Sequence, residues 1–324
     1  MNLLIIGAGQ LGSRHLQSCL KYNKVINIYV VDNLQSSILL SQSRTLEVEQ
    51  KANHNVQYFT DMSMIKENNF DYLIIATTAV SRFKILREAL SLFTIKYAIL
   101  EKVLFQDLES YTNALTLIKD HNLITFVNCP IRTYPFFKKI KNNFISNDFT
   151  TSLNYVGGDW VGLACNSIHY LDLLNFLSNE KLISIKIDDL DDGFIPSKRA
   201  GSIEFTGTYE ALFNAGSSLN FSSIRNSDQN SIIEILNGKY KILINELSGE
   251  YKIFSNNTLI ESSKYDIVFQ SDLTHLMIDQ IEKTGNCELI KFDQSLDLHK
   301  HLIVNLLAHY NDIAGINTPI LPIT

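Results

Sequence analysis

The fold is decided by residues 3–12, which read Leu3-Leu4-Ile5-Ile6-Gly7-Ala8-Gly9-Gln10-Leu11-Gly12. The first four form an apolar run that is too short for a helix and suits a buried parallel strand. The glycines then follow the spacing G-x-G-x-x-G, and a helix-like segment extends to about Lys21. A second apolar strand, 25–31, ends in Asp32, 20 residues after Gly12. This order of strand, glycine-rich turn, helix and strand indicates a βαβ unit.

Each part of this unit suits a dinucleotide. Gly7 permits the tight turn, Gly9 lets the backbone approach a diphosphate, and Gly12 lets helix and strand pack closely. The helix N-terminus offers free N–H groups and partial positive charge. We therefore expect the cofactor to be bound by Gly7, Gly9, Gln10, Leu11 and Gly12. The alternative, a glycine-rich structural turn, is disfavoured by the flanking strand, helix and acidic residue.

Asp32 bears on the choice of cofactor. Its carboxylate can accept hydrogen bonds from the adenosine ribose hydroxyls and would repel a 2′-phosphate, so NAD is expected over NADP. Neighbours such as Asn33, Ser36 and Ser37 could still accommodate a phosphate, which keeps NADP open.

The composition excludes several classes of protein. A length of 324 residues suggests about two domains, and 45% hydrophobic with 19% charged residues is typical of a globular protein. The net charge of −6 and the lack of a basic run argue against nucleic acid, and no apolar run is long enough for a membrane span. We expect a cytoplasmic protein without a signal peptide, whose four scattered cysteines stay reduced. A zinc site at Cys129, Cys165 and His169 is conceivable, but no metal is expected.

The chain predicts two domains. Up to residue 127, strands alternate with helices, which indicates an NAD(P)-binding domain over 1–127 with a doubly wound parallel sheet. From residue 128, consecutive strands indicate an α+β domain over 128–324 with an open, mostly antiparallel sheet and an Asn237-Gly238 type I′ hairpin. The first domain's expected strands are 3–6, 25–31, 56–59, 72–77, 97–100 and 123–127, and its helices are 34–44, 81–92 and 108–120. The second domain's expected strands are 152–156, 183–187, 202–206, 211–215, 231–236 and 240–244, and its helices are 134–144, 166–177, 273–283 and 296–310.

Two groups of residues could carry chemistry. Glu101-Lys102 stands at the carboxyl end of a predicted strand, where open α/β sheets bind ligands, and Lys102 could hold a substrate hydroxyl and move its proton. The alternative is a solvated charge pair. His169 lies three residues before Asp172 on one helix face, and a histidine is the usual proton carrier near neutral pH. A single helical histidine is, however, often structural.

Several neighbours of His169 are candidates for substrate binding. Arg132 could clamp a carboxylate or phosphate, or form an interdomain salt bridge. Trp160, the sole tryptophan, could line a pocket or fill core. Asp159 precedes it, and Cys165 and Asn166 stand shortly before His169.

These motifs resemble those of the Gfo/Idh/MocA oxidoreductases, the relatives of glucose–fructose oxidoreductase and inositol dehydrogenase, over essentially the whole chain. The resemblance rests on the glycine turn followed by Ser13-Arg14-His15, on Ile74-Ile75-Ala76-Thr77-Thr78, on Leu100-Glu101-Lys102-Val103-Leu104-Phe105, on Asn128-Cys129-Pro130-Ile131-Arg132, on Ile168-His169-Tyr170-Leu171-Asp172, and on the closing residues 319–324.

The resemblance implies a Rossmann domain with Thr77, Thr78, Glu101 and Lys102 at the cofactor, and a second domain whose free sheet face forms a dimer interface. It also implies that Lys102 and His169 flank the substrate as catalytic residues. The sequence departs from the family pattern at three positions. Val103 replaces the proline after Glu-Lys, Arg82 stands where a histidine is common, and Cys165 replaces an aspartate. A thiol is a poor substitute for a carboxylate in relaying a proton, and Asp159 is the alternative source of that negative charge.

The expected function is therefore an NAD(P)-dependent oxidoreductase that moves a hydride between nicotinamide and a CH–OH or C=O carbon of a sugar, sugar acid or nucleotide-linked sugar. A homodimer or homotetramer is expected. The alternative is a non-catalytic, dinucleotide-binding sensor or regulatory protein on the same fold. A hydrolase or lyase that uses bound NAD transiently is a third hypothesis.

Overall fold

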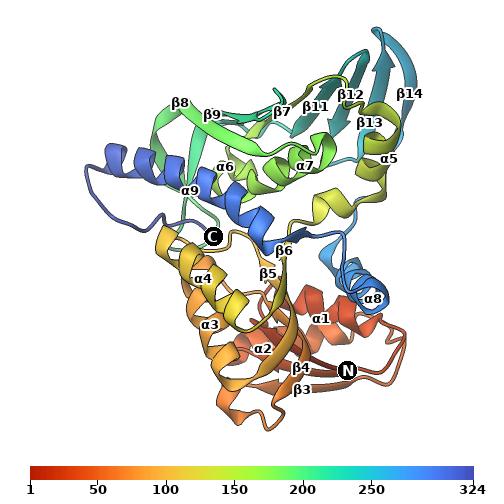
Figure 1. The fold of residues 1–324 in the computed structure, drawn as a ribbon, viewed down its shortest axis with the longest axis vertical. Helices are drawn as coiled ribbons and strands as arrows, with labels where there is room; N and C mark the ends of the chain where they lie inside the picture. The colour runs from red at the N-terminus through yellow and green to blue at the C-terminus, as the bar shows by residue number, and fades with distance from the viewer. The chain divides into compact units, whose positions relative to one another are not determined.

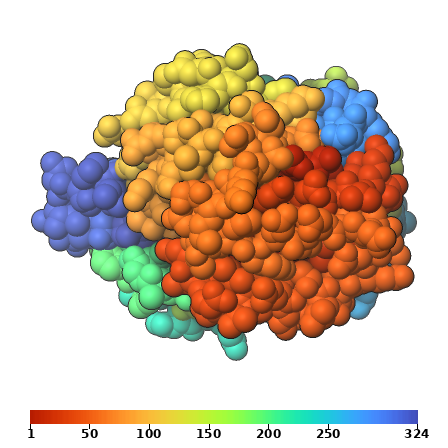
Figure 2. Space-filling view, turned by 90° about the horizontal axis from the view of Figure 1, so that it is seen from below, coloured from red at the N-terminus to blue at the C-terminus, as the bar shows by residue number.

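The computed structural model describes residues 1–324, and the chain divides into two compact units. Unit 1 comprises residues 1–105, 109–128 and 268–293, and unit 2 comprises 106–108, 129–267 and 294–324. The segment 268–293, which the sequence pattern placed in the second domain, thus groups with the first. Its helix contributes Met277, Ile278 and Ile281 to the core of unit 1. Figure 2 shows this light-blue segment beside the red residues near the N-terminus.

Unit 1 is built on a seven-stranded sheet with the order β15-β6-β5-β4-β1-β2-β3. Six strands are parallel, as expected for a doubly wound sheet, and the short β15 adds an antiparallel edge. The strands are β1 Asn2–Ile6, β2 Asn27–Val31, β3 Asn55–Phe59, β4 Asn69–Ile75, β5 Thr94–Glu101, β6 Ile124–Asn128 and β15 Ile290–Lys291. The helices are α1 Gly12–Leu20, α2 Gln35–Thr45, η1 Met62–Met64, α3 Ala79–Leu92, α4 Leu108–Asp120, η4 Gln270–Asp272 and α8 Thr274–Thr284.

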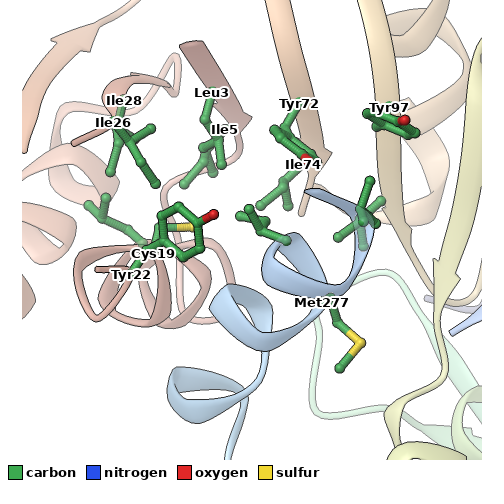
Figure 3. Packing of buried hydrophobic residues seen from close by; sticks show 14 of the residues in the cluster. Leu3, Ile5, Cys19, Tyr22, Ile26, Ile28, Tyr72, Ile74, Tyr97 and Met277 are labelled. Carbon is green, nitrogen blue, oxygen red and sulfur yellow. The ribbon is translucent and has the colours of Figure 1, made fainter. Parts of the chain in front are cut away.

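One face of this sheet is covered by α1 and α8, and α3 and α4 lie on the opposite side (Figure 1). The strands β1, β4, β5 and β6 are mostly buried because both faces are covered, which explains their continuous apolar runs, whereas the edge strand β3 is only partly buried. Figure 3 shows side chains from neighbouring strands, among them Leu3, Ile28, Ile74 and Tyr97, facing the helices that carry Cys19 and Met277.

Unit 2 is built on an eight-stranded sheet with the order β14-β13-β12-β11-β7-β10-β9-β8. All neighbours are antiparallel except β7 and β10, so the mostly antiparallel α+β prediction is confirmed. The strands are β7 Thr151–Gly158, β8 Leu182–Pro196, β9 Ile203–Phe213, β10 Ser218–Ile224, β11 Ile232–Asn237, β12 Tyr240–Asn245, β13 Glu250–Ser255 and β14 Thr258–Lys264. The helices are η2 Pro130–Thr133, α5 Pro135–Phe144, η3 Asp159–Val161, α6 Leu163–Asn166, α7 Ile168–Ser178 and α9 Phe292–Ala314.

Several strand predictions in unit 2 were wrong. The expected strands 202–206 and 211–215 are one continuous strand, β9, which passes through Gly207 at a φ of +99° without turning back. Strands β10, β13 and β14 were missed because their serine, asparagine and lysine residues weaken the apolar alternation. None of the helices combines the length and apolarity needed to cross a membrane.

The β11–β12 hairpin exists, but its turn is not type I′. Asn237 pairs with Tyr240, so Gly238 and Lys239 form the two-residue turn, and only Gly238 has a positive φ. The type I′ requirement for positive φ at both central residues is met instead in the β13–β14 hairpin, at Asn256 and Asn257.

Candidate functional site

The glycine turn of unit 1 has the geometry of a dinucleotide cradle. A Cβ on Gly7 would lie 2.9 Å from the carbonyl carbon of Ala76, and a Cβ on Gly12 would lie 1.7 Å from the carbonyl oxygen of Gly7. Both glycines are therefore required by backbone contacts between β1, β4 and α1. A Cβ on Gly9 would meet nothing within 4 Å, so the backbone there borders open space that a diphosphate can enter.

Polar groups for a nucleotide surround this turn. The Asp32 carboxylate accepts hydrogen bonds from the backbone N–H of Ala8 at 2.7 Å and of Leu34 at 2.9 Å, which fixes it beside the turn. Each oxygen keeps lone-pair capacity for a ribose hydroxyl. Thr77 follows β4, and its Oγ1 is buried without a hydrogen-bond partner. Thr78 precedes the first residue of α3. These residues fit a dinucleotide.

Arg44, which the sequence did not single out, supports the turn from α2. Its guanidinium donates to the carbonyl oxygen of Gln10 at 2.7 Å and to Ser13 Oγ at 2.6 Å, and it also bonds the side-chain oxygen of Gln10. Gln10 is thereby held from its carbonyl side, while Leu11 leads into the first turn of α1. That turn contains no acidic residue that would oppose an anion.

Glu101 lies at the centre of a buried polar network in unit 1. His15 Nε2 lies 2.8 Å from Glu101 Oε1, and His15 Nδ1 lies 2.8 Å from Thr274 Oγ1. The Asn128 side-chain amide donates to Glu101 and also to Gln270. Burial alone would raise the pKa of the Glu101 carboxyl, but the bonds from His15 and Asn128 bring that pKa below its usual value. Glu101 is therefore a fixed carboxylate rather than a solvated one.

The backbone after Lys102 is fixed as well. Arg82 is 1% exposed, and its guanidinium donates to the carbonyl oxygens of Val103, of Leu104 at 3.0 Å, and of Thr77. The peptide bond between Lys102 and Val103 is cis although Val103 is not a proline. Lys102 thus stands between two anchored segments at the carboxyl end of β5.

In unit 2, Arg132 and Asp172 form a buried ion pair. Their N–O distance is 2.7 Å, and the Asp172 side chain is 1% exposed. Burial raises the pKa of Asp172 to about 7, and Arg132 opposes that rise. The guanidinium also lies 5.2 Å from the ring centroid of Phe176, and its Nε has no hydrogen-bond partner. Arg132 thus holds α7, which carries His169, and keeps one donor to spare.

The remaining candidate residues of unit 2 gather around η3 and α6. Asp159 accepts a hydrogen bond from the backbone N–H of Asn226 at 2.9 Å, and Trp160 Nε1 donates to the carbonyl oxygen of Gln229 at 3.1 Å. The short helix η3 is therefore joined to the loop 226–229.

Segment 162–166 is fixed by two further hydrogen bonds. The Asn166 amide donates to the carbonyl oxygen of Val161 at 2.7 Å, while Cys165 is buried. The buried Glu204 accepts from the backbone N–H of Ala164 at 2.7 Å, which fixes the residue preceding Cys165.

No sequence pattern points to a further hydrogen-bonded carboxylate of unit 2, Glu246. It accepts hydrogen bonds from the hydroxyls of Tyr155 at 2.9 Å, of Ser231 at 2.7 Å, and of Tyr170. One of these partners, Tyr170, is the residue after the candidate His169 on α7, and the His169 side chain is partly exposed. No local pattern around Glu246 signals this cluster, because its partners lie 15 to 91 residues away.

The comparisons with known proteins agree with this geometry. Residues 1–129 match the Gfo/Idh/MocA family model, described as an oxidoreductase family with an NAD-binding Rossmann fold. Unit 1 is thus similar to the NAD-binding domain of these oxidoreductases over the range of that match. Among curated protein sequences, none matches the chain significantly.

Solved structures share the fold of this chain along nearly its whole length. UDP-N-acetylglucosamine 3-dehydrogenase GnnA from Acidithiobacillus ferrooxidans is 12% identical, with a TM-score of 0.69 and coverage of 94% of this chain and 96% of that one. An Agrobacterium radiobacter oxidoreductase, solved with NAD+, L-tartaric acid and magnesium, is 13% identical, with a TM-score of 0.71 and coverage of 97% and 99%. A super-repressor mutant of Gal80p from Saccharomyces cerevisiae is 14% identical, with a TM-score of 0.69 and coverage of 98% and 96%.

Proposed function

We propose that the protein is an NAD(P)-dependent oxidoreductase that interconverts a CH–OH and a C=O carbon of a sugar, sugar acid or nucleotide-linked sugar. The observation that carries this proposal is the cradle of unit 1, in which open space at Gly9 borders the fixed Asp32 carboxylate. Lys102 directly follows β5 of the same parallel sheet, at the carboxyl end where ligands of such sheets bind. The substrate class is supported by relatives named for a nucleotide sugar and for a complex with tartaric acid.

The roles of the residues follow from their chemistry. When bound, the nicotinamide would supply a carbon that accepts or gives a hydride. Lys102 holds the reacting oxygen and takes or delivers its proton, and its backbone stays in place because Glu101 and Arg82 anchor both sides. His169 acts as the partner acid or base.

The substrate-binding residues are assigned to unit 2. Arg132 offers its remaining donors to an anionic substrate group. Asp159, Trp160, Cys165 and Asn166 form the wall that binds the rest of the substrate. The homodimer or homotetramer stays a prediction.

A second candidate function is a dinucleotide-binding regulator without catalysis. It is favoured by the buried thiol of Cys165 at the position where the family usually has an aspartate, and by the similarity to Gal80p, a protein described as a super-repressor variant. Binding of the cofactor without hydride transfer to any sugar would support this function.

Replacing Lys102 by alanine tests the enzyme proposal. We expect hydride transfer to or from a panel of sugars, sugar acids and nucleotide sugars, followed by NADH absorbance, to fall by about 100-fold or more, because general acid–base groups contribute about that much. NADH binding should persist. The control is Lys96→Ala, since Lys96 lies on the same strand and is exposed. Unchanged turnover in the Lys102 variant would show that another group moves the proton.

Replacing Asp32 by asparagine tests the preference for NAD. The amide keeps an oxygen that can accept from Ala8 or Leu34 but loses the charge that repels a 2′-phosphate. We expect the ratio of NADPH to NADH dissociation constants, measured by calorimetric titration, to fall by about tenfold, equivalent to about 1.4 kcal/mol. Asp61→Asn is the matched control, because Asp61 caps η1 after β3. A wild type that binds NADPH more tightly than NADH would contradict the assignment.

A further inference from the structure

Unit 2 holds a carboxylate that the proposed reaction does not use. Glu246 follows the last residue of β12 and is partly exposed. Its three hydrogen-bond donors, the hydroxyls of Tyr155, Tyr170 and Ser231, are all neutral, and the carboxylate forms no ion pair. The Glu246 carboxylate is thus held by neutral hydroxyls and has no cation of its own, so a cationic ligand group could pair with it.

The three hydrogen bonds leave one lone-pair position of the Glu246 carboxylate free to accept another hydrogen bond. A carboxylate offers about four lone-pair positions. Tyr155 and Ser231 both donate to Oε2, while Tyr170 alone donates to Oε1. Oε1 therefore keeps room for one more donor, and a charged donor forms a stronger bond there than a neutral one.

Aromatic rings surround the Glu246 carboxylate. The ring centroids of Tyr155 and Tyr170 lie 4.4 Å apart. Burial and then the Glu246 charge raise the pKa of Tyr265 and raise that of Tyr134 to about 12. These phenols stay neutral, so they add no competing charge, and their ring faces can attract a cation.

The cluster adjoins the segments already assigned to the substrate. A Cβ on Gly157 would lie 3.4 Å from the Cβ of Ser231, so the end of β7, which leads into Asp159 and Trp160, lies beside the Glu246 cluster. Tyr170 is the residue after His169 on α7. Glu246 is thus placed in unit 2 beside the loop proposed to bind substrate.

We infer that Glu246 binds a protonated amine of the substrate, which makes an amino sugar or its derivative the substrate class. This inference rests on the proposed function for its placement at the substrate. The negative charge selects a cation over a neutral hydroxyl, and the tyrosine hydroxyls on the other positions fix the carboxylate in one orientation.

Three sugars that differ at one substituent test the inference: glucosamine, glucose and N-acetylglucosamine, which carry an ammonium, a hydroxyl and a neutral amide. Their dissociation constants are measured on the full chain by ligand-observed nuclear magnetic resonance near neutral pH. We expect glucosamine to bind at least about tenfold more tightly than the other two. Equal binding of the three, or binding of none, would overturn the inference.

Variants of the Glu246 cluster test whether this carboxylate causes the preference for glucosamine. Glu246→Gln should reduce glucosamine binding to the level of glucose, whereas Tyr155→Phe removes one donor but keeps the charge and should keep the selectivity. Glu261→Gln is the matched control, because Glu261 also bonds a tyrosine, Tyr251, but is already paired with Lys139. Selectivity that survives Glu246→Gln would place the amine elsewhere.

A parallel NADH titration separates this inference from the proposed function. Amine selectivity without NADH binding would overturn the enzyme proposal alone. NADH binding and turnover of neutral sugars without amine selectivity would overturn the role of Glu246 alone.

Discussion

Gly12→Ala is expected to weaken NADH binding by about 100-fold or more and to destabilise unit 1 by about 1–3 kcal/mol. The added Cβ would lie 1.7 Å from the carbonyl oxygen of Gly7 and 2.8 Å from its carbonyl carbon. Both are backbone atoms, so no side chain can move aside, and α1 must shift away from β1. That shift displaces the helix N-terminus, whose N–H groups are proposed to bind the diphosphate. Calorimetric titration with NADH and urea unfolding measure the two effects.

Gly9→Ala is the control that separates binding from folding. The added Cβ meets nothing within 4 Å, and Gly9 does not have a positive φ, so this variant should unfold at the wild-type urea concentration. Its methyl group would nevertheless occupy the space through which a diphosphate reaches the backbone, and NADH binding should still weaken. Normal NADH affinity in both variants would show that the turn does not bind a dinucleotide.

The sequence predicts unit 1 well because its signals are local. The apolar runs of β1, β4 and β5 are continuous since both faces of their sheet are buried, and the glycine spacing fixes the turn between β1 and α1. In unit 2 one sheet face is less buried, so strands such as β10 carry serine and asparagine at alternate positions and escape detection. Segment 268–293 returns to unit 1 through contacts made far along the chain, which no local pattern records.

The candidate site shows the same contrast between local sequence signals and contacts of residues that are distant in sequence. The residues of the glycine turn and Asp32 follow from spacing alone. The partners that fix Glu101 do not, because His15 and Asn128 lie 86 and 27 residues away in sequence. Arg132 was expected to bind substrate or form an interdomain salt bridge, and its bond to Asp172 within unit 2 depends on how η2 meets α7. The spacing of residues along the sequence predicts which of them lie on the same helix or strand. Contacts between residues of different helices and strands can be known only from the three-dimensional structure.

Arg132→Met should destabilise unit 2 by about 3–5 kcal/mol at pH 8, because it leaves the buried Asp172 charge without its partner. The single tryptophan, Trp160, lies in unit 2, so its fluorescence during urea unfolding reports the effect. The matched control is Lys139→Met, which removes the cation of the more exposed pair with Glu261. That change should cost at most about 1 kcal/mol.

The effect of Arg132→Met should also depend on pH. In the wild type the folded-state pKa of Asp172 is raised to about 7, so the folded state binds more protons than the unfolded state between pH 3.8, the ordinary pKa of this group, and pH 7. Stability from this group therefore falls as the pH rises through that window and levels off above it. Without Arg132 the folded-state pKa rises further, and the fall continues above pH 7 by up to about 1.4 kcal/mol per pH unit.

The deficit of the Arg132→Met variant relative to the wild type should therefore be smallest near pH 6 and widen towards pH 9. Adding Asp172→Asn removes the titrating group without changing its size, and the double variant should lose this pH dependence. A deficit that is constant with pH, or unchanged in the double variant, would mean that Arg132 stabilises unit 2 through its packing on Phe176 rather than through the Asp172 charge. The pH series thus separates the electrostatic role of Arg132 from its packing role before any substrate is known.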